Sequence, residues 1–258
     1  KKKTKQLKKL VTPFILRRNK KEVLTELPDK IEQNIILPFN DEEEKLYVAN
    51  LAEANNHLQE LYDLEGSDKM QILKLLTRLR QLCLEPRLVY DNIDQPSSKL
   101  KACMELIKTM QENKQKVLLF SSFTSVLDLI AEECQKAGIT YYMLTGSTNK
   151  EDRRELVSRF QKDDTTVFLI SLKAGGTGLN LTSAEAVIHF DPWWNVSAQN
   201  QATDRAYRIG QKNNVQVFNL VMKDSVEEKI IELQKRKKEL ADMFVENNSG
   251  GLSQMSKE

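Results

Sequence analysis

Five short apolar segments, separated by stretches with helical patterning, constrain this chain more than any other feature. Each is five to seven residues long and rich in β-branched or aromatic side chains, which favours a strand. The predicted strands are Val117–Ser121, Thr140–Leu144, Val167–Ser171, Ala186–Phe190 and Val215–Val221. Helices are predicted between most of them, one over Thr124–Ala137 and another from Thr148 with Glu151 as its capping partner. This alternation predicts an α/β fold, a parallel sheet with helices on both faces.

The part of the chain before these strands has a different pattern and predicts a pair of helices. Asn40 and Glu43 form a capping-box pattern ahead of a helix over Asp41–Leu64. Apolar residues at helical spacing then predict a second helix over Met70–Cys83.

These patterns divide the chain into five predicted segments. The last helix opens with a capping-box pattern at Ser225 and Glu228. The segments are a basic connector over residues 1–38, a helical pair over 39–95, an α/β lobe over 96–223, a C-terminal helix over 224–246 and a disordered tail over 247–258.

Charge is unevenly distributed along the chain. The net charge is only +2, but residues 1–38 hold eleven Lys or Arg against four Asp or Glu. Such an arm attracts phosphates in a salt-dependent way. A solvated linker is the alternative, and it is the commoner use of such a run.

The cysteines and the hydropathy exclude several classes of protein. Cys83, Cys103 and Cys134 are far apart, odd in number and without a CxxC pair, so neither a zinc site nor a disulfide framework is predicted. A reducing, intracellular compartment is expected. No run reaches the roughly 18 apolar residues of a membrane helix, and no signal-peptide apolar region is present, so no membrane partner is expected.

Four polar, small or aromatic segments follow the predicted strands. In open parallel sheets, ligands bind beyond the carboxyl ends of the strands. The four segments are 121–124, 145–148, 171–182 and 191–195. Because all four are expected at one edge of the sheet, they predict an extended binding surface.

The segment SLKAGGTGLNLT, residues 171–182, holds the longest glycine cluster. Gly175, Gly176 and Gly178 allow the backbone to approach a ligand closely, and Lys173 adds positive charge, which together suit phosphate oxygens. A tight turn is the alternative. The cluster is not GxGxxG, and no P-loop GxxxxGK[ST] occurs in the chain.

The segment QATDRAYRIGQ, residues 201–211, carries two arginines. On a helix, Arg205 and Arg208 share one face, with Gln201 one turn before Arg205. Two guanidinium groups that point the same way suit a concentrated negative charge such as a γ-phosphate. A solvated charged helix is the alternative.

Two further residue types have separate interpretations. Trp193 and Trp194 are adjacent beside a proline, so one is expected to be exposed as a wedge or stacking surface. His189 is predicted to be a core histidine of a strand, and His57 a helix-surface residue.

Five segments resemble, in order and spacing, the C-terminal-lobe motifs of the Swi/Snf family of helicase-like ATPases. They are FSSFT, TGST, SLKAGGTGLNLT, DPWWN and QATDRAYRIGQ. PFILRRNKKEVLTELPDK resembles that family's connection between two lobes, and LRQLCLEP its helical protrusion. The resemblance implies a RecA-like lobe over 96–223, with ATP in a cleft between two such lobes and tracking along double-stranded DNA without strand separation. It also implies that the C-terminal helix, Ser225–Val245, is a brace.

The resemblance assigns roles to eleven residues. Arg205 and Arg208 match arginine fingers, and Gln201 and Asp204 would help to orient them. Gly176 and Gly178 match the segment that senses nucleotide and contacts the DNA backbone. Ser121, Ser122, Thr148 and Lys173 match positions that face a DNA phosphate strand, and Trp194 matches a tryptophan at the DNA groove.

The sequence also departs from the family pattern. Tyr207 stands where many relatives have His, Thr145 where Asp is common, Val196 where Pro is usual, and Leu84 and Glu85 where Asn and His are common. No metal site is expected, because the Walker lysine, the magnesium carboxylate and the general base belong to the first lobe. ATP with Mg is therefore expected to be held mainly by that lobe, and this chain alone is predicted to be inactive as an ATPase.

The expected partners are thus an N-terminal RecA-like lobe of the same protein and double-stranded DNA, and the sequence carries no signal for an oligomeric state. The expected location is the cytoplasm or nucleoid of a bacterium or the nucleus of a eukaryote. Two alternatives remain open, a non-enzymatic DNA-binding or partner-docking α/β module and the equivalent lobe of an RNA helicase.

Overall fold

The computed structural model describes residues 28–63, 69–174 and 179–249 and divides the chain into two compact units. The larger unit is Pro28–Ile231. Of the smaller unit, the described part is the helical stretch 232–249, which belongs to helix α9 (Val226–Ser249).

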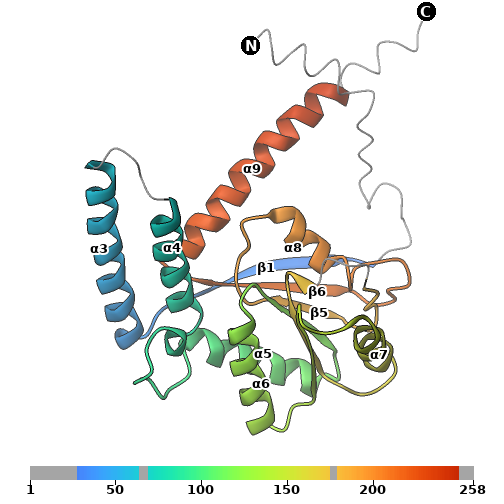
Figure 1. Ribbon diagram of the computed structural model, residues 1–258. Helices are drawn as coiled ribbons and strands as arrows, with labels where there is room; N and C mark the ends of the chain where they lie inside the picture. Colours follow the sequence, from blue (N-terminus) through green and yellow to red (C-terminus); the bar gives the residue numbers. More distant parts are fainter. Residues whose placement is uncertain (1–27, 64–68, 175–178, 250–258) are drawn as a thin grey trace, which may run out of the picture. The chain divides into compact units, whose positions relative to one another are not determined.

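The larger unit is built on a six-stranded sheet in the order β1-β6-β5-β2-β4-β3, and all its strand pairs are parallel (Figure 1). The strands are β1 (Lys30–Leu37), β2 (Val117–Ser121), β3 (Tyr141–Leu144), β4 (Val167–Ser171), β5 (Ala186–His189) and β6 (Val215–Met222). Every residue of β2, β4 and β5 is buried, as expected for strands covered on both faces. The predicted α/β parallel sheet is confirmed.

Strand β1 was not predicted from the sequence. Residues 30–37 were assigned to the basic connector, but they pair with β6 along their whole length, from Lys30 beside Val215 to Leu37 beside Met222. The mixed polar composition of this segment suits an edge strand, because one side of it faces solvent.

Helices cover the two faces of the sheet in pairs. Helices α5 (Ser98–Glu112) and α6 (Thr124–Lys136) pack on one face, where their apolar residues join alternate residues of β2, β4, β5 and β6 in the main core. Helix α7 (Lys150–Phe160) packs on the other face through Phe160 against Phe168. Helix α8 (Val196–Thr203) lies on that second face as well, and Figure 1 shows it on the opposite side of the sheet from α5 and α6.

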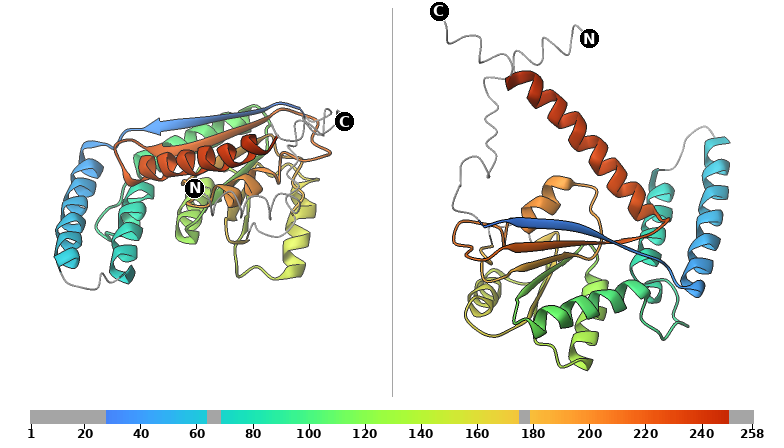
Figure 2. Two further views of the ribbon diagram at one scale, coloured as in Figure 1. Left: turned by 90° about the horizontal axis from the view of Figure 1, so that it is seen from above. Right: turned by 180° about the vertical axis from the view of Figure 1, so that it is seen from behind.

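The predicted helical pair is present as α3 (Asp41–Asp63) and α4 (Lys69–Leu84), which lie side by side in both views of Figure 2. The predicted capping box is formed, since the Glu43 amide donates to Asn40 Oδ1 at 2.9 Å and the Asn40 amide donates to a Glu43 carboxylate oxygen at 3.1 Å. His57 lies exposed on α3, as predicted.

A short 3-10 helix, η2 (Pro86–Leu88), links this pair to α5. Buried Glu85 accepts hydrogen bonds from the Arg87 side chain at 3.0 and 3.2 Å and from the Ser97 amide at 3.0 Å. The carboxylate therefore has specific partners at a position where the family pattern differs.

Two helix starts differ in detail from their predictions. Asn149, rather than Thr148, caps α7 by accepting from the amides of Glu151 and Asp152. At α9, Ser225 accepts from the Glu227 amide, whereas Glu228 accepts from the Asp224 amide. Asparagine and serine both favour N-caps, so neighbouring candidates compete for one helix start.

Candidate functional site

The segments that follow the strands lie at one edge of the sheet, as expected. Because all six strands are parallel, the segments after β2, β3, β4 and β5 leave the sheet at the same edge. The topology therefore brings together 121–124, 145–148 and 191–195 with the start of the glycine segment.

Asp191, directly beyond β5, connects two of these segments. Its carboxylate accepts from the Ser121 hydroxyl at 2.7 Å and from the Ser122 amide at 3.0 Å, and it is also bonded by the Ser122 hydroxyl. Ser121 is fully buried, so its hydroxyl orients Asp191 and does not face solvent where a DNA phosphate would lie. Ser122 is half-buried and stays a predicted DNA contact, but its amide and hydroxyl both donate to Asp191, so a phosphate would have to compete with that carboxylate.

The turn after β3 is held by its own hydroxyl groups. Thr148 Oγ1 accepts from the Thr145 amide at 3.1 Å, and the hydroxyls of Thr145 and Ser147 lie 2.8 Å apart. Thr148 is half-buried and can still present one side to a ligand. Thr145 thus shapes the turn at a position where relatives commonly have Asp.

The glycine segment is described at its two ends. Lys173 is exposed, and the carbonyl of Ala174 accepts from Arg153 Nη1 at 3.0 Å, which joins this loop to α7. Gly175, Gly176 and Gly178 lie outside the described residues. At the far end, the Leu181 amide donates to the Arg205 carbonyl at 3.0 Å, so the glycine segment and the arginine turn are directly bonded.

The two arginines lie in a turn and not on a helix. Helix α8 ends at Thr203, so the expectation that helical spacing aligns Arg205 and Arg208 is wrong. The residues after Thr203 bond back over two to four positions as successive turns. Gly210 has φ +100°, a conformation that favours glycine and ends continuation as a helix.

The turn nevertheless creates a site with unbalanced positive charge. Arg205 is 9% exposed, and its Nε is buried without a hydrogen-bond partner among the described residues. Burial lowers the pKa of Arg205, the nearby charge of Arg208 lowers it further, and Asp204 opposes this. Arg208 is exposed. Because a buried N–H donor without a hydrogen-bond partner is costly, the arrangement suits an acceptor supplied from outside, such as an anion.

Other residues of QATDRAYRIGQ support this turn. Gln201 is exposed and Asp204 half-buried. Buried Gln211 was not singled out in the sequence analysis, although it ends the motif. Its side-chain amide donates to the carbonyls of Ala184 at 2.8 Å and Ala206 at 3.3 Å, which fixes the arginine turn against the segment before β5.

The two tryptophans are each half-buried, so neither is a fully enclosed core residue. The Trp193 amide donates to Gln199 Oε1 at 3.2 Å, and this bond ties the turn to α8. Trp194 is thus placed at the same edge as Ser122 by the segment that follows β5.

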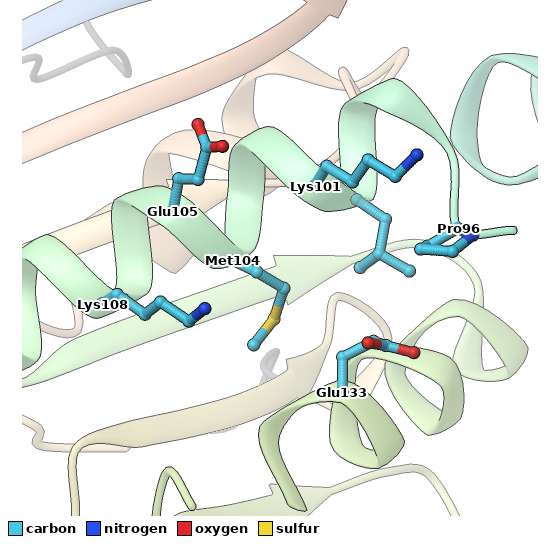
Figure 3. Close-up of a pocket in the computed structure, with 7 residues that line it drawn as sticks. Pro96, Lys101, Met104, Glu105, Lys108 and Glu133 are labelled. Carbon is cyan, nitrogen blue, oxygen red and sulfur yellow. The ribbon is translucent and has the colours of Figure 1, made fainter. Parts of the chain in front are cut away.

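A separate depression of about 210 Å³ lies between α5 and α6 (Figure 3). Its lining includes Lys101, Lys108, Glu105 and Glu133, so charges of both signs meet there. None of the predicted site residues lines it, and the candidate site is therefore not this depression.

The described ranges 28–63, 69–174 and 179–249 contain neither a helix suited to a membrane nor a cluster of metal-binding side chains. Within these ranges, no helix is long and apolar enough to cross a membrane. The same ranges contain no group of three or more His, Cys, Asp and Glu side chains that could hold a metal ion.

Residues 98–210 match the family described as helicase conserved C-terminal domain, and residues 1–88 match the SNF2-related domain. A relative from Mycoplasma pneumoniae, named an uncharacterized ATP-dependent helicase, is 41% identical over 230 residues. These cover 89% of this chain but 22% of the relative, so the chain spans about a fifth of that relative's length.

Two solved structures are similar to the chain. The Sulfolobus solfataricus SWI2/SNF2 ATPase core in complex with double-stranded DNA has a TM-score of 0.71 and 32% identity, and the match covers 98% of this chain and 54% of that one. The C-terminal part of the Fun30 ATPase domain also has a TM-score of 0.71, with 28% identity and coverage of 81% and 90%.

Proposed function

This chain belongs to the Swi/Snf family of helicase-like ATPases as its RecA-like C-terminal lobe, and from this premise we propose that it serves as the second motor lobe of an ATP-dependent translocase or remodeller of double-stranded DNA. The observation that carries the proposal is the buried Nε of Arg205, which has no hydrogen-bond partner in the part of the chain that the structure describes, beside exposed Arg208. An N-terminal RecA-like lobe of the same protein is the proposed partner that holds the nucleotide opposite this turn.

The proposed catalytic contribution is charge stabilisation by the two arginines. Phosphoryl transfer spreads negative charge over the oxygens of the γ-phosphate, and an arginine finger is worth about 10³–10⁵ in rate. Arg208, being exposed, is the group that can reach across to a neighbouring lobe. Arg205 adds positive potential behind it, and Gln201 and Asp204 precede the pair on the same segment.

The residues of the arginine turn fit the phosphates of ATP. A buried guanidinium N–H, the Nε of Arg205, that lacks a partner among the described residues suits a phosphate oxygen. Magnesium bound with ATP takes one or two carboxylates, waters and phosphate oxygens as ligands, and we propose that the first lobe supplies most of the protein ligands. When bound, Mg-ATP supplies the phosphoryl group, and this chain contributes the arginines that face it.

The proposed DNA contacts lie at the carboxyl edge of the sheet. Ser122, Thr148 and exposed Lys173 are proposed to contact a phosphate strand, and Trp194 to approach the groove. Gly176 and Gly178 are proposed to link these contacts to the nucleotide, because their segment ends in the bond from Leu181 to Arg205. Such backbone contacts position a duplex without reading its sequence.

A reconstitution experiment tests the proposal. The chain alone should show no ATP hydrolysis with duplex DNA, because the sequence contains no P-loop. Added to the first lobe of the same protein, it should restore hydrolysis that duplex DNA stimulates more than RNA does. If the chain alone hydrolysed ATP and Arg205→Ala abolished that activity, the proposal that the first lobe must hold the nucleotide would be contradicted.

Arg208→Ala in the two-lobe protein should lower the rate of hydrolysis by about 10³ while largely sparing duplex affinity. Steady-state ATPase assays and duplex titrations at matched salt would measure the two effects. Arg159→Ala is the matched control, because Arg159 is an exposed arginine on α7 paired with Glu155. An equal fall in duplex affinity and in turnover for Arg208→Ala would overturn the arginine-finger assignment.

A further inference from the structure

Arg80 on α4 reaches out of the helical pair and into the sheet edge that carries the proposed DNA contacts. Its Nη2 donates to Asp191 Oδ2 at 3.0 Å and to the Ser122 hydroxyl at 2.9 Å. The partners follow two different strands, β5 and β2. The ion pair is buried, with side-chain exposures of 10% for Arg80 and 1% for Asp191.

The guanidinium group also contacts aromatic rings from both segments. Its central carbon lies 5.0 Å from the ring centre of Phe123 and 5.7 Å from that of Trp193. Cation–π contacts of this length are attractive and restrict the ring planes. One side chain therefore touches the segment after β2 and the tryptophan turn after β5 at the same time.

Asp191 has no spare acceptor capacity in this arrangement. Its two oxygens accept from Ser121, from the amide and hydroxyl of Ser122, and from Arg80. A lysine in place of Arg80 would offer a point charge without the planar face that covers the rings. The contact therefore requires the geometry of an arginine and not merely a positive charge.

We propose that Arg80 is a positioning residue through which the α3–α4 pair sets the tryptophan turn, Trp193–Trp194, and Ser122 for contact with duplex DNA. The part concerning DNA rests on the proposed function. Among the proposed phosphate contacts that the structure describes, Arg80 bonds Ser122, so its effect passes through Ser122, Asp191 and Trp193.

Arg78 provides a matched control on the same helix. It also donates to a side-chain oxygen, Asn50 Oδ1 at 2.6 Å, and lies 5.5 Å from the ring centre of Tyr90. These partners lie on α3 and just after η2, away from the sheet edge. A general effect of losing an α4 arginine should thus appear equally for Arg78 and Arg80.

Tryptophan fluorescence tests the proposal directly, because Trp193 and Trp194 are the chain's two tryptophans. Arg80→Lys and Arg80→Gln should raise the acrylamide quenching constant by about twofold, since both remove the planar guanidinium group that covers the Trp193 ring. Asp191→Asn should produce a change in the same direction. Arg78→Lys and Arg78→Gln should leave quenching at the wild-type value.

Unchanged quenching in the Arg80 variants, or an equal change in the Arg78 variants, would overturn the proposal. So would loss of the fold in both Arg80 variants while the Arg78 variants fold, because the residue would then be structural only. This measurement needs neither ATP nor DNA, so failure of the motor function and failure of the positioning role give different results.

The two-lobe protein adds the functional readout. Arg80→Lys should weaken duplex binding by about tenfold, comparable to one lost charge-assisted contact. Hydrolysis at saturating duplex should stay within about twofold of wild type, because the arginine turn is untouched. A fall in the maximal rate with unchanged duplex affinity would contradict the proposed role.

Discussion

At the scale of single residues, His189 is held uncharged by its surroundings. The ring is fully buried at the end of β5 and stacks on Phe120 with centroids 5.7 Å apart. One ring nitrogen, Nε2, is hydrogen bonded with Thr203 at 2.9 Å, whereas Nδ1 is buried without a partner in the part of the chain that the structure describes. Burial lowers the pKa of His189 to about 4, although Glu32 and Asp191 oppose this.

This environment predicts a pH-dependent stability. Between about pH 6.5 and 4 the unfolded chain binds a proton at His189 and the folded chain does not, so the stability falls as the pH falls through that window. The difference in pKa corresponds to about 3 kcal/mol in total. Urea unfolding at several pH values should show this loss, and His189→Gln should remove most of it.

His57 supplies the control for this measurement, because the chain's other histidine is exposed on α3. His57→Gln should leave the pH profile of the unfolding free energy unchanged. If His189→Gln kept the wild-type slope between pH 6.5 and 4, other titrating groups would be responsible.

Residue patterns predicted which segments form the site better than they predicted how the side chains are placed. Arg205 and Arg208 do lie near each other, but a turn brings them together and not the helical spacing that suggested it. Arg80 was missed because its partner Asp191 is 111 residues away and no local spacing signals such a pair. The Ser121 hydroxyl was expected to face DNA, but in the fold it donates a hydrogen bond to Asp191.

At the scale of elements, a buried ion pair joins α5 to the first turn of α9. Lys99 is 0% and Glu227 1% exposed, and the ammonium nitrogen lies 2.6 and 2.7 Å from the two carboxylate oxygens. Glu227 also accepts from the Met222 amide at 2.8 Å, at the end of β6. The start of α9 is thus fixed to α5 and to the sheet.

Glu227→Gln should destabilise the chain by about 3–5 kcal/mol, because it leaves the Lys99 ammonium buried without a counter-charge. The double variant Lys99→Met with Glu227→Gln should recover most of that loss. It removes both charges, and the glutamine oxygen can still accept from Met222. Denaturant unfolding of the single and double variants would measure both effects.

The exposed pair Arg159–Glu155 on α7 is the control for ion pairing as such, because solvent weakens its attraction. Glu155→Gln should leave the unfolding midpoint close to that of the wild type. A double variant no more stable than Glu227→Gln alone would contradict the argument from an unpaired buried charge.

Elements with strong local signals were predictable, and those whose stability depends on distant partners were not. The bounds of β2 and β4 match their predictions because both are apolar runs buried on two faces. Helix α5 was not separately predicted, although Ser97 caps it. Strand β1 was missed because its partner β6 begins 185 positions later. Pairing between such distant segments produces no pattern within a short stretch of sequence.

At the scale of the whole molecule, the larger unit depends on an edge strand supplied by the chain before the helical pair. Ile35 and Leu37 of β1 pack against the main core, and β1 covers the open side of β6. In a chain that begins at Phe39, the free energy of unfolding should therefore fall by about 3 kcal/mol and the Tm by roughly 10 °C. Calorimetry would measure the shift.

A chain that begins at Pro28 is the matched comparison, because it retains the whole larger unit, Pro28–Ile231. Its Tm should stay close to that of the full chain. Equal melting temperatures for chains beginning at Pro28 and at Phe39 would show that β1 adds nothing to stability.

The pairing of β1 with β6 also determines how this unit would carry tension. The chain enters the sheet at Lys30, at the amino end of β1, and leaves it at Met222, at the carboxyl end of β6. A pull between these two points acts along the strands, so the hydrogen bonds of the ladder are loaded together in shear rather than opened one at a time. The sheet edge can therefore act as a stiff mechanical joint between the segment before residue 30 and the start of α9.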